Sequence, residues 1–277
     1  MIIVCSKEGY LCNRLFHFAH LVSFAIENNE IIWYPYIKEY QHLFDNLNKI
    51  NLKNNKILIY SSPFIHLILR VLRWILIRVN IKCLIIHNES EQVVCLRNHK
   101  NMNKRLLFLS GWLIRDKISL SIQKEKIKIL FQFKKEIVRC CQERIREIKN
   151  NNTLLIGLHI RRGDYYRFEK GKYFYSIGVY KEKMDQLRTI FNKKKVHFLI
   201  CSNDNDVFNS DLMNGYDISH SRGSEMHDLY SLSICDLIVG PPSTFSGWAS
   251  FYGSVPLLYL TDQNQIINEL EFKIIEG

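Results

Sequence analysis

Two adjacent arginines in the second half of the chain have the chemistry of a phosphate-binding site. Arg161 and Arg162 lie in the sequence HIRRGDY, which spans residues 159–165. A guanidinium group keeps its charge and offers parallel N–H donors to a pair of phosphate oxygens. We therefore expect these arginines to bind a ligand that carries phosphate groups. The bland alternative is a cluster of surface salt bridges, so other residues must support the prediction.

Two further groups suit other parts of a nucleotide. Ser243 and Thr244 stand where a helix should begin, so the N–H groups of its first turn would be available to phosphate. Asp228, in the helix predicted before them, is an anionic acceptor for the N–H edge of a guanine. The sequence has neither a Walker lysine motif nor a G-x-G-x-x-G motif, which argues against phosphoryl transfer from ATP and dinucleotide redox chemistry.

The elements predicted around these residues bring them to one edge of a sheet. Three apolar runs predict buried strands, at Leu154–Ile160, Val196–Ser202 and Cys235–Val239. Polar residues follow these runs, in the clusters His159–Asp164, Ser202–Asp204 and Ser243–Ser246. Ligands of open α/β sheets bind outside the carboxyl ends of the strands, so the clusters should face one cleft. Asp204 and Phe245 therefore join the arginines in a candidate site for a nucleotide diphosphate.

Helical patterns separate these strands and complete the second half. They span Val179–Phe191, Met226–Ile234 and Ser243–Phe251. A last strand is predicted at Val255–Leu260 and a terminal helix at Gln263–Glu271. Apolar strands that alternate with helices predict an α/β fold, in which parallel sheets are flanked by helices.

The first half begins in the same way. Its predicted elements are a strand at Met1–Cys5, a helix at Leu11–Asn28 and a strand at Ile31–Tyr34. This order is the beginning of a Rossmann-like unit. Residues 35–110 show no clear pattern, and Ile118–Lys149 predicts one or two charged helices that end at an asparagine run. We expect the boundary there, with two Rossmann-like domains at residues 1–150 and 151–277.

The two halves differ in charge. Residues 1–150 contain 25 Lys and Arg against 12 Asp and Glu, whereas residues 151–277 contain 13 against 15. Either the two domains face different partners, or the first reflects a bias toward lysine and asparagine. Nucleic acid is a disfavoured partner, because no helix-turn-helix, zinc-finger or RNA-binding aromatic signature accompanies the basic residues.

The cysteines indicate thiols rather than a metal site. The chain has eight cysteines and no C-x-x-C pair, and most of them lie in apolar runs. We expect no zinc site or other metal centre. Without a secretory signal peptide, these cysteines are typical of reduced thiols in a cytoplasmic protein.

The longest apolar tract, Pro63 to Ile86, is a candidate for membrane contact. Four basic residues interrupt it, so it is a poor candidate for a membrane-spanning helix. His66, Arg70 and Arg73 would instead form a basic stripe on an apolar helix, which could lie on an anionic membrane surface. The alternative is a packed helix whose arginines extend to solvent. The first reading predicts a peripheral protein at the inner face of the membrane.

Longer motifs connect these residues to a known family. They are HIRRGDY at 159–165, SND at 202–204, PSTFSGWAS at 242–250, the spacing D-L-Y-x-L-x-x-x-D from Asp228 to Asp236, and G-Y-L-C-N-R-L at 9–15. Together they resemble the α-1,2-fucosyltransferases, in the superfamily that also holds α-1,6- and protein O-fucosyltransferases. Residues 35–150 are essentially unmatched.

The resemblance implies a fold, a reaction and roles for particular residues. It implies a GT-B type glycosyltransferase of two Rossmann-like domains, which transfers fucose from GDP-fucose to a galactoside hydroxyl of a glycan with inversion and without a metal. Arg161 would stabilise the leaving β-phosphate as the catalytic charge. The other implied contacts to the donor are His159 on the nucleoside, Asp228 on the guanine, Ser243 and Thr244 on the pyrophosphate, and Asn13 from the first domain.

Several alternatives stay open on the sequence alone. The general base is Asp164, Glu8 or no strong base at all, and Asp164 could equally brace the neighbouring arginines. A fucosyltransferase with another acceptor, and a sugar-nucleotide- or glycan-binding protein without catalysis, would both carry many of the same residues. A basic nucleic-acid-binding protein is the third class.

Overall fold

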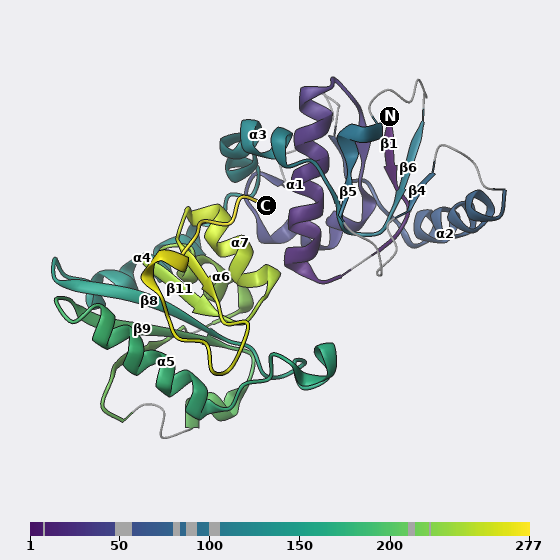
Figure 1. The fold of residues 1–277 in the computed structure, drawn as a ribbon. Coiled ribbons are helices and arrows are strands. Elements are labelled where there is room, and N and C mark those ends of the chain that lie inside the picture. The colour runs from purple at the N-terminus through teal and green to yellow at the C-terminus, as the bar shows by residue number, and fades with distance from the viewer. Residues whose placement is uncertain are drawn as a thin grey trace. The chain divides into compact units, whose positions relative to one another are not determined.

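The chain forms two compact units, each built on a parallel sheet. The computed structural model describes residues 1–7, 9–47, 57–79, 84–86, 93–99, 106–209, 214–221 and 223–277. The first unit is Met1–Lys134 with Gly277, and the second is Lys135–Glu276. The α/β class and the helix-flanked parallel sheets agree with the sequence prediction (Figure 1).

The division between the units falls before helix α4 (Lys135–Ile148), whereas the sequence placed a boundary after it, at residue 150. The reason is packing. Helix α4 lies against α6 (Glu225–Leu232), and its Gln142 Nε2 donates a hydrogen bond to the hydroxyl of Tyr230 at 3.2 Å. The amphipathic pattern alone cannot tell which sheet a helix covers.

The first unit has a five-stranded sheet in the order β3-β2-β1-β6-β4, and all its strand pairs are parallel. The strands are β1 (Ile2–Val4), β2 (Ile32–Trp33), β3 (Ile57–Leu58), β4 (Leu84–Ile86) and β6 (Leu107–Ser110). Helix α1 (Leu11–Glu27) follows β1 and packs on α3 (Lys117–Leu130). The strand, helix and strand expected at the start of the chain are therefore confirmed.

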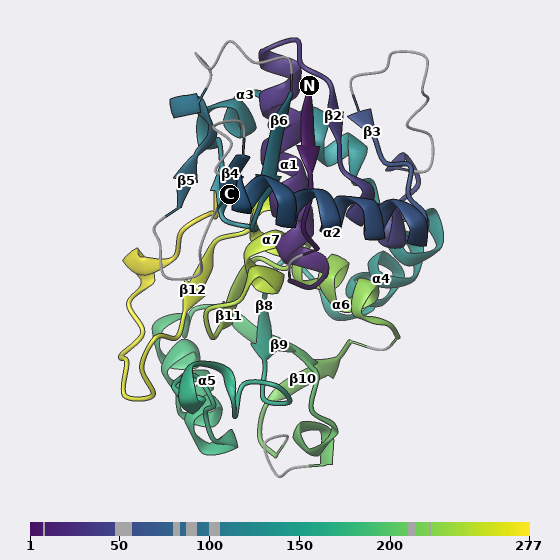
Figure 2. The same ribbon diagram turned by 90° about the vertical axis from the view of Figure 1, so that its right-hand side faces the viewer.

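The region that the sequence left unassigned contains most of the first unit's remaining elements. Within residues 35–110 they are η1 (Pro35–Leu43), α2 (Pro63–Arg78), β5 (Val94–Cys95) and η3 (Leu96–His99), and β7 (Ile114–Arg115) follows shortly after. Strands β5 and β7 form a separate parallel pair. Figures 1 and 2 show α1 and α2 on opposite faces of the main sheet. The connections β1–α1–β2 and β3–α2–β4 run in opposite directions along the sheet, so right-handed crossovers place their helices on opposite faces.

The tract from Pro63 to Ile86 is not one helix. Helix α2 ends at Arg78, and Leu84–Ile86 form β4, which pairs with β6. The expectation of a single helix over the whole tract was wrong because a buried parallel strand and an apolar helix have the same composition over a short run. Over the ranges given above, no helix has both the length and the apolar character needed to cross a bilayer.

The second unit is a doubly wound parallel sheet in the order β10-β9-β8-β11-β12. Its strands are β8 (Thr153–Ile160), β9 (Lys195–Ser202), β10 (Asp217–His220), β11 (Leu237–Gly240) and β12 (Leu257–Tyr259). Its other elements are η4 (Phe168–Gly171), α5 (Ile177–Ile190), η5 (Asn205–Asn209), α7 (Thr244–Gly253) and η7 (Glu269–Glu271). The strand order reverses between β8 and β11, which is the point where such sheets bind ligands.

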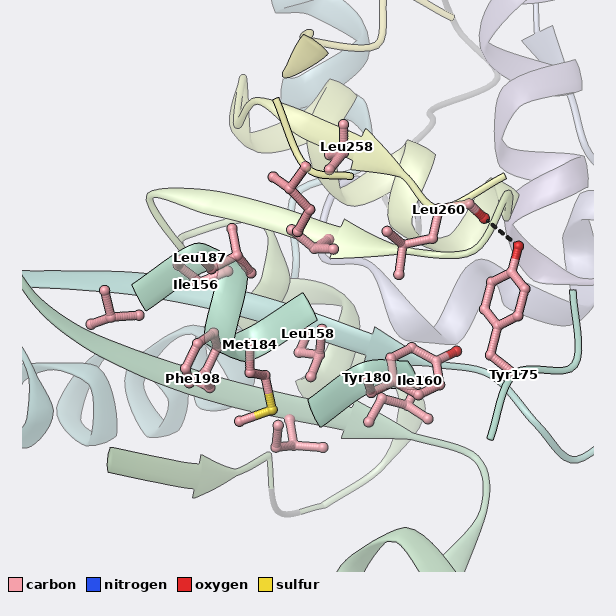
Figure 3. Close-up of a cluster of buried hydrophobic side chains, with 14 of the residues drawn as sticks. Ile156, Leu158, Ile160, Tyr175, Tyr180, Met184, Leu187, Phe198, Leu258 and Leu260 are labelled. Atoms are coloured by element: carbon pink, nitrogen blue, oxygen red, sulfur yellow. Dashed lines mark hydrogen bonds between the residues drawn. The ribbon is translucent and has the colours of Figure 1, made fainter. Parts of the chain in front are cut away.

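The main core of this unit lies between the sheet and α5. Alternate residues of β8, among them Ile156 and Leu158, contact Met184 and Leu187 of α5 (Figure 3). At the end of this core the Tyr175 hydroxyl donates a hydrogen bond to the Leu260 carbonyl at 2.9 Å. This contact connects the segment before α5 with the end of β12.

The opposite face of β8 packs on the helices α4 and α6. Leu155 and Leu199 form a smaller core there with Ile145 of α4. Gly157 allows α6 to approach closely, because a Cβ atom at this position would lie 2.6 Å from Cδ2 of Leu232. His159, two residues further along β8, is on this same face.

The C-terminal segment differs from the prediction. Only Glu269–Glu271 of the expected helix Gln263–Glu271 is helical, as the short 3₁₀ turn η7. Side chains compete with a helix there, since Gln265 Oε1 accepts a hydrogen bond from the Thr261 N–H and Asn268 Oδ1 accepts one from Leu270. Ile267 is buried in the main core, but Ile266 and Leu270 are 78% and 86% exposed, so a helix here would bury few of its apolar residues.

Candidate active site

The candidate site lies at the carboxyl ends of β8 and β11. The loop 161–164 follows β8, and the sequence Pro241-Pro242-Ser243 joins β11 to α7. Ser243 is the N-cap of α7, and its hydroxyl accepts a hydrogen bond from the Phe245 N–H at 3.2 Å. Helix α7 therefore begins at the switch point, with the positive end of its dipole toward this edge of the sheet.

Arg161 is held between the two loops. Its Nε and Nη2 donate to Oδ1 and Oδ2 of Asp164 at 3.0 and 2.7 Å, and its Nη1 donates to Oγ of Ser243 at 3.3 Å. The guanidinium also lies over the Tyr165 ring, 5.0 Å from its centroid. Its charge is thus fixed in orientation beside the first turn of α7.

Asp164 holds this arginine and is itself kept ionised by it. The hydrogen bonds and charge of Arg161 lower the pKa of the Asp164 carboxyl below its ordinary value, although partial burial opposes the shift. An acid with a lowered pKa accepts a proton poorly at neutral pH. The geometry therefore gives Asp164 a positioning role and makes it a weak general base.

Two tyrosine hydroxyls fix the loop before α7. The Tyr165 hydroxyl donates to the Pro242 carbonyl at 2.6 Å, and the Tyr259 hydroxyl donates to the Ser243 carbonyl at 3.2 Å. Burial raises the pKa of both phenols, so they stay protonated donors at neutral pH. Strand β12 and the loop after β8 thereby position the N-terminus of α7.

Arg162 joins the loop after β8 to the loop after β9. Its Nε donates to Oδ2 of Asp204 at 2.9 Å, and its Nη1 donates to the Tyr175 carbonyl at 3.2 Å. The backbone N–H groups of Arg162 and Gly163 both donate to Oδ1 of Asn203, at 3.1 and 3.3 Å. The Arg162 side chain thus binds Asp204 and a backbone carbonyl, and Asp204 also accepts a hydrogen bond from the backbone N–H of Asp206.

His159 is a buried neutral imidazole at the end of β8. Burial, with a smaller effect from Arg161, lowers its pKa to about 3. Its ring lies 5.2 Å from the Phe245 ring, centroid to centroid, and its Nδ1 has no hydrogen-bond partner among the described residues. Gly240 makes room for this strand end, since a Cβ atom there would lie 2.6 Å from the His159 carbonyl oxygen.

Asp228 lies in the first turn of α6, next to β9, the neighbour of the strand β8 that carries His159. Burial raises the pKa of its carboxyl to about 6, and the charge of Glu225 adds to the rise. Its backbone carbonyl accepts a long hydrogen bond from the Cys201 thiol at 3.9 Å, and Cys201 is the register partner of His159. Asp228 is therefore near the same edge of the sheet as the Arg161 cluster.

The structure brings most of the predicted residues together in the second unit. Those at the carboxyl edge of its sheet are His159, Arg161, Arg162, Asp164, Asp204, Asp228, Ser243, Thr244 and Phe245. Asn13 lies in the first unit, in the first turn of α1. There the neighbouring Arg14 donates from Nη2 to the Gly9 carbonyl at 2.7 Å. Glu8 lies outside the described residues.

Sequence reasoning missed four residues that position the site. Tyr165 and Asn203 belong to motifs already quoted, so the motifs could have suggested them. Tyr175 and Tyr259 stand in no motif. The Tyr175 carbonyl accepts from Arg162 and the Tyr259 hydroxyl donates to the Ser243 carbonyl, and tertiary packing brings each pair together.

A doubly wound parallel sheet with a fixed arginine and a helix N-terminus at its switch point defines a nucleotide-binding type of α/β protein. The family model of glycosyl transferase family 11 matches residues 120–273. The chain belongs to this family of fucosyltransferases. The resemblance inferred from the motifs is thus confirmed at the level of the family. No curated protein matches the chain.

Solved structures of fucosyltransferases have a similar fold. A mutant of Arabidopsis thaliana FUT1 in complex with GDP aligns over 98% of this chain and 73% of its own, with 12% identity and a TM-score of 0.60. The α-1,6-fucosyltransferase NodZ from Bradyrhizobium, soaked with GDP-fucose, aligns over 96% and 97%, with 14% identity and a TM-score of 0.59. POFUT1 in complex with GDP aligns over 93% and 97%, with 14% identity and a TM-score of 0.54.

Proposed function

We propose that this chain is an inverting glycosyltransferase that moves fucose from GDP-fucose to a galactoside hydroxyl of a glycan, forming an α-1,2 linkage. Family membership supports fucosyl transfer, and the GDP and GDP-fucose in structures of similar fold support the donor. The observation that carries the proposal is the Arg161 guanidinium held between Asp164 and Ser243. The linkage and acceptor rest on the motifs HIRRGDY and PSTFSGWAS.

Arg161 would act on the leaving group. Transfer breaks the bond between the anomeric carbon of fucose and the β-phosphate oxygen, while the acceptor oxygen attacks from the opposite face. The electron pair of the broken bond stays on the phosphate, where negative charge grows. A positive group that is already oriented stabilises this charge without reorganisation. We propose that Arg161 replaces the divalent cation of metal-using transferases, so that the reaction needs no metal.

The other residues would bind the nucleotide. Ser243 and Thr244 begin α7, so the first turn of that helix suits the pyrophosphate. His159 is neutral and lies beside Phe245, which suits contact with the nucleoside rather than with a phosphate. Asp228 would accept hydrogen bonds from the N–H groups of guanine.

Asp164 would position Arg161 and would not accept the proton of the acceptor hydroxyl. Its bidentate pairing and its lowered pKa both favour this role over that of general base. A dissociative transition state needs only a weak base, because the acceptor hydroxyl becomes acidic late in the reaction. Glu8 stays a candidate for that base.

The two units would form a GT-B arrangement in which Asn13 of the first unit reaches the donor. The likeness to fucosyltransferase structures over nearly the whole chain supports this proposal. We also infer that the enzyme works in the cytoplasm. The described cysteines are free thiols, two of them exposed, which is typical of a reducing compartment.

A comparison of Arg161→Ala with Arg167→Ala tests the proposal. Arg167 is an exposed arginine of the same loop, so its loss removes the same charge without touching the candidate site. With GDP-fucose and lactose as substrates, we expect Arg161→Ala to lower turnover by about 10²–10³-fold, because one fixed transition-state contact is lost. Arg167→Ala should stay within about twofold of the wild type. If Arg161→Ala keeps more than half of the wild-type turnover, the assignment is wrong.

The same assay separates the proposal from its two alternatives. A non-catalytic sugar-nucleotide- or glycan-binding protein would bind GDP-fucose without releasing GDP or labelling any glycan. A fucosyltransferase with another acceptor would release GDP with a different glycan or with a protein hydroxyl, and leave lactose unmodified. Linkage analysis of the product then decides between the α-1,2 bond and another.

A further inference from the structure

The outward face of helix α2 is apolar along its length. The helix packs on its unit through one stripe, Ile65, Leu69 and Leu76. Large apolar side chains on the opposite face are exposed, with Phe64 70% and Trp74 56% accessible to solvent. This exposed face, which we call the α2 face, consists of Phe64, Leu67, Ile68, Val71, Trp74 and Ile75.

The spacing shows that these residues form one continuous surface. They follow one another at intervals of three and four residues, which places them on a single side of a helix. Surface helices usually carry polar residues on this side, and a contiguous exposed apolar patch marks an interaction site. The α2 face therefore has the character of an interaction surface.

The charged residues of helix α2 itself are all basic. Arg70 and Arg78 are exposed on α2, and the helix contains no Asp or Glu. The Arg78 guanidinium lies over the Trp74 ring, 4.4 Å from its centroid. The surrounding sequence continues this bias, since residues 46–88 contain seven Lys and Arg and no acidic residue.

The helix is attached firmly enough to bind as a preformed element. The Ser62 hydroxyl caps its N-terminus by accepting from the Ile65 N–H at 3.3 Å. Arg73, on the protein side, donates from Nε to Oγ of the buried Ser110 at 2.6 Å. His66 stacks on Tyr36, with ring centroids 4.8 Å apart. These contacts with the first unit set the orientation of helix α2 before any partner is bound.

We propose that the α2 face docks the protein on an anionic lipid bilayer, with the helix lying in the plane of the interface. An apolar face inserts between headgroups and acyl chains, and flanking cations pair with anionic headgroups. A tryptophan with a polar edge is suited to this interface. A protein groove could also cover an apolar helix, but the exposed Arg70 and Arg78, in a sequence that has no Asp or Glu over residues 46–88, favour anionic lipid. This inference does not depend on the proposed fucosyl transfer.

Co-sedimentation of the full chain with vesicles tests the proposal. Vesicles of phosphatidylcholine alone are compared with an equal mixture of phosphatidylcholine and phosphatidylglycerol. We expect binding to the anionic vesicles that high salt weakens, and at least about tenfold weaker binding to neutral ones. The variants Phe64→Ser/Trp74→Ser and Arg70→Gln/Arg78→Gln should each lower the affinity for anionic vesicles about tenfold or more.

Matched control variants show whether vesicle binding depends on the α2 face or on any exposed apolar or basic residues. Ile118→Ser/Ile122→Ser removes two exposed apolar side chains from α3, and Lys193→Gln/Lys194→Gln removes two exposed charges from the second unit. Both should bind within about twofold of the wild type. Transfer to a soluble acceptor should be unchanged in both α2 variants, whereas Arg161→Ala should bind vesicles normally.

A spectroscopic measurement keeps the test valid if a variant folds poorly. Quenching by brominated lipid should reach the wild-type protein and be lost in Trp74→Phe, because only Trp74 lies on the α2 face. Equal binding to neutral and anionic vesicles, wild-type binding by the α2 variants, or unchanged quenching in Trp74→Phe would overturn the proposal. A dimer that dissociates in Phe64→Ser/Trp74→Ser, without vesicle binding, would overturn it and assign the face to a second copy of the chain.

Discussion

The carboxylate of Asp164 and the guanidinium of Arg161 form a unit that must be considered as a pair. Asp164 is half exposed, so its ion pair with Arg161 contributes little to folding stability. Its value lies in orientation, because both of its oxygens hold Arg161 in one plane beside Ser243. The ion pair therefore fixes the orientation of the Arg161 guanidinium, and the lowered pKa of Asp164 makes it a weaker base than an unpaired carboxylate.

The variant Asp164→Asn distinguishes these roles. The amide keeps the shape but loses the charge, so Arg161 becomes less well oriented, and we expect kcat to fall about tenfold to a hundredfold. Any acidic limb of the wild-type pH–rate profile should persist in this variant, because we propose that Asp164 does not accept the proton of the acceptor hydroxyl. Glu169→Gln, an exposed acid of the same loop, is the control. Disappearance of the acidic limb in Asp164→Asn would instead identify Asp164 as the general base.

Asp228 should make donor binding depend on pH. Its raised pKa, about 6, means that it is ionised at pH 7 and mostly protonated at pH 5. A protonated carboxyl cannot accept two hydrogen bonds from guanine, so affinity for GDP-fucose should fall about tenfold from pH 7 to pH 5. His159, with a pKa of about 3, stays neutral over this range.

Calorimetry with GDP-fucose measures this dependence. GDP-fucose is preferable to GDP because its diester phosphates do not titrate in this range. Asp228→Asn should bind more weakly at pH 7 and lose the dependence on pH. A carboxyl with a raised pKa also costs folding free energy when it is ionised, so this variant should be more stable than the wild type above pH 6, by on the order of 1–3 kcal/mol. Affinity of the wild type that does not change between pH 7 and pH 5 would exclude the guanine contact.

At the scale of elements, the sequence was most informative where strands are long and fully buried. The cores of β8 and β9 are continuous apolar runs, and both were found. Strand β10 was missed, because its four residues Asp217–His220 are largely polar and lie at the edge of the sheet. Strands β2 and β3 have two residues each, too few for a period to be visible.

The same contrast holds for the site. The residues around Arg161 were found because one short loop carries them in a contiguous motif. Tyr259 contributes from another strand, and only the pairing of β11 with β12 brings it to the Ser243 carbonyl. Sequence patterns identify residues that act through local geometry, whereas long-range hydrogen bonds need the topology.

The close approach of the strand ends of β11 and β8, at Gly240 and His159, predicts the effect of a larger residue at Gly240. Gly240→Ala would place a Cβ atom 2.6 Å from the His159 carbonyl oxygen, so the two strands must separate at the site. We expect a loss of about 1–3 kcal/mol in the free energy of unfolding, together with weaker binding of GDP. Chemical denaturation and calorimetry measure these effects.

Gly178→Ala is the matched control for this prediction. Gly178 is exposed near the start of α5, and a Cβ atom there would meet nothing closer than 3.6 Å. Alanine is favoured over glycine in a helix, so this variant should be neutral or up to about 1 kcal/mol more stable. Equal stability of Gly240→Ala and the wild type would show that the strands tolerate separation, and that the close approach does not shape the site.

At the scale of the whole molecule, the two units each contain a five-stranded parallel sheet but differ in the side chains that they expose. In each sheet polar residues of the fucosyltransferase motifs follow the central strand, in the first turn of α1 after β1 and in the loop 161–164 after β8. The second unit carries the fixed charge of Arg161, which we propose binds the nucleotide. The first unit supplies Asn13, most of the basic residues and the α2 face. We therefore expect mutations in the two units to alter fucosyl transfer and membrane binding separately.

Protection of the whole chain against thermal unfolding tests donor specificity. A ligand that binds only the folded protein raises its apparent stability by RT ln(1 + [L]/Kd), about 2.7 kcal/mol at a hundred times Kd. We expect GDP and GDP-fucose to raise the unfolding temperature in the presence of a chelator, and UDP-sugars to leave it unchanged. Arg161→Ala should weaken the protection, while Arg167→Ala should not. Protection or turnover that disappears with the chelator and returns with manganese would show that a metal ion, and not Arg161 alone, balances the charge of the pyrophosphate.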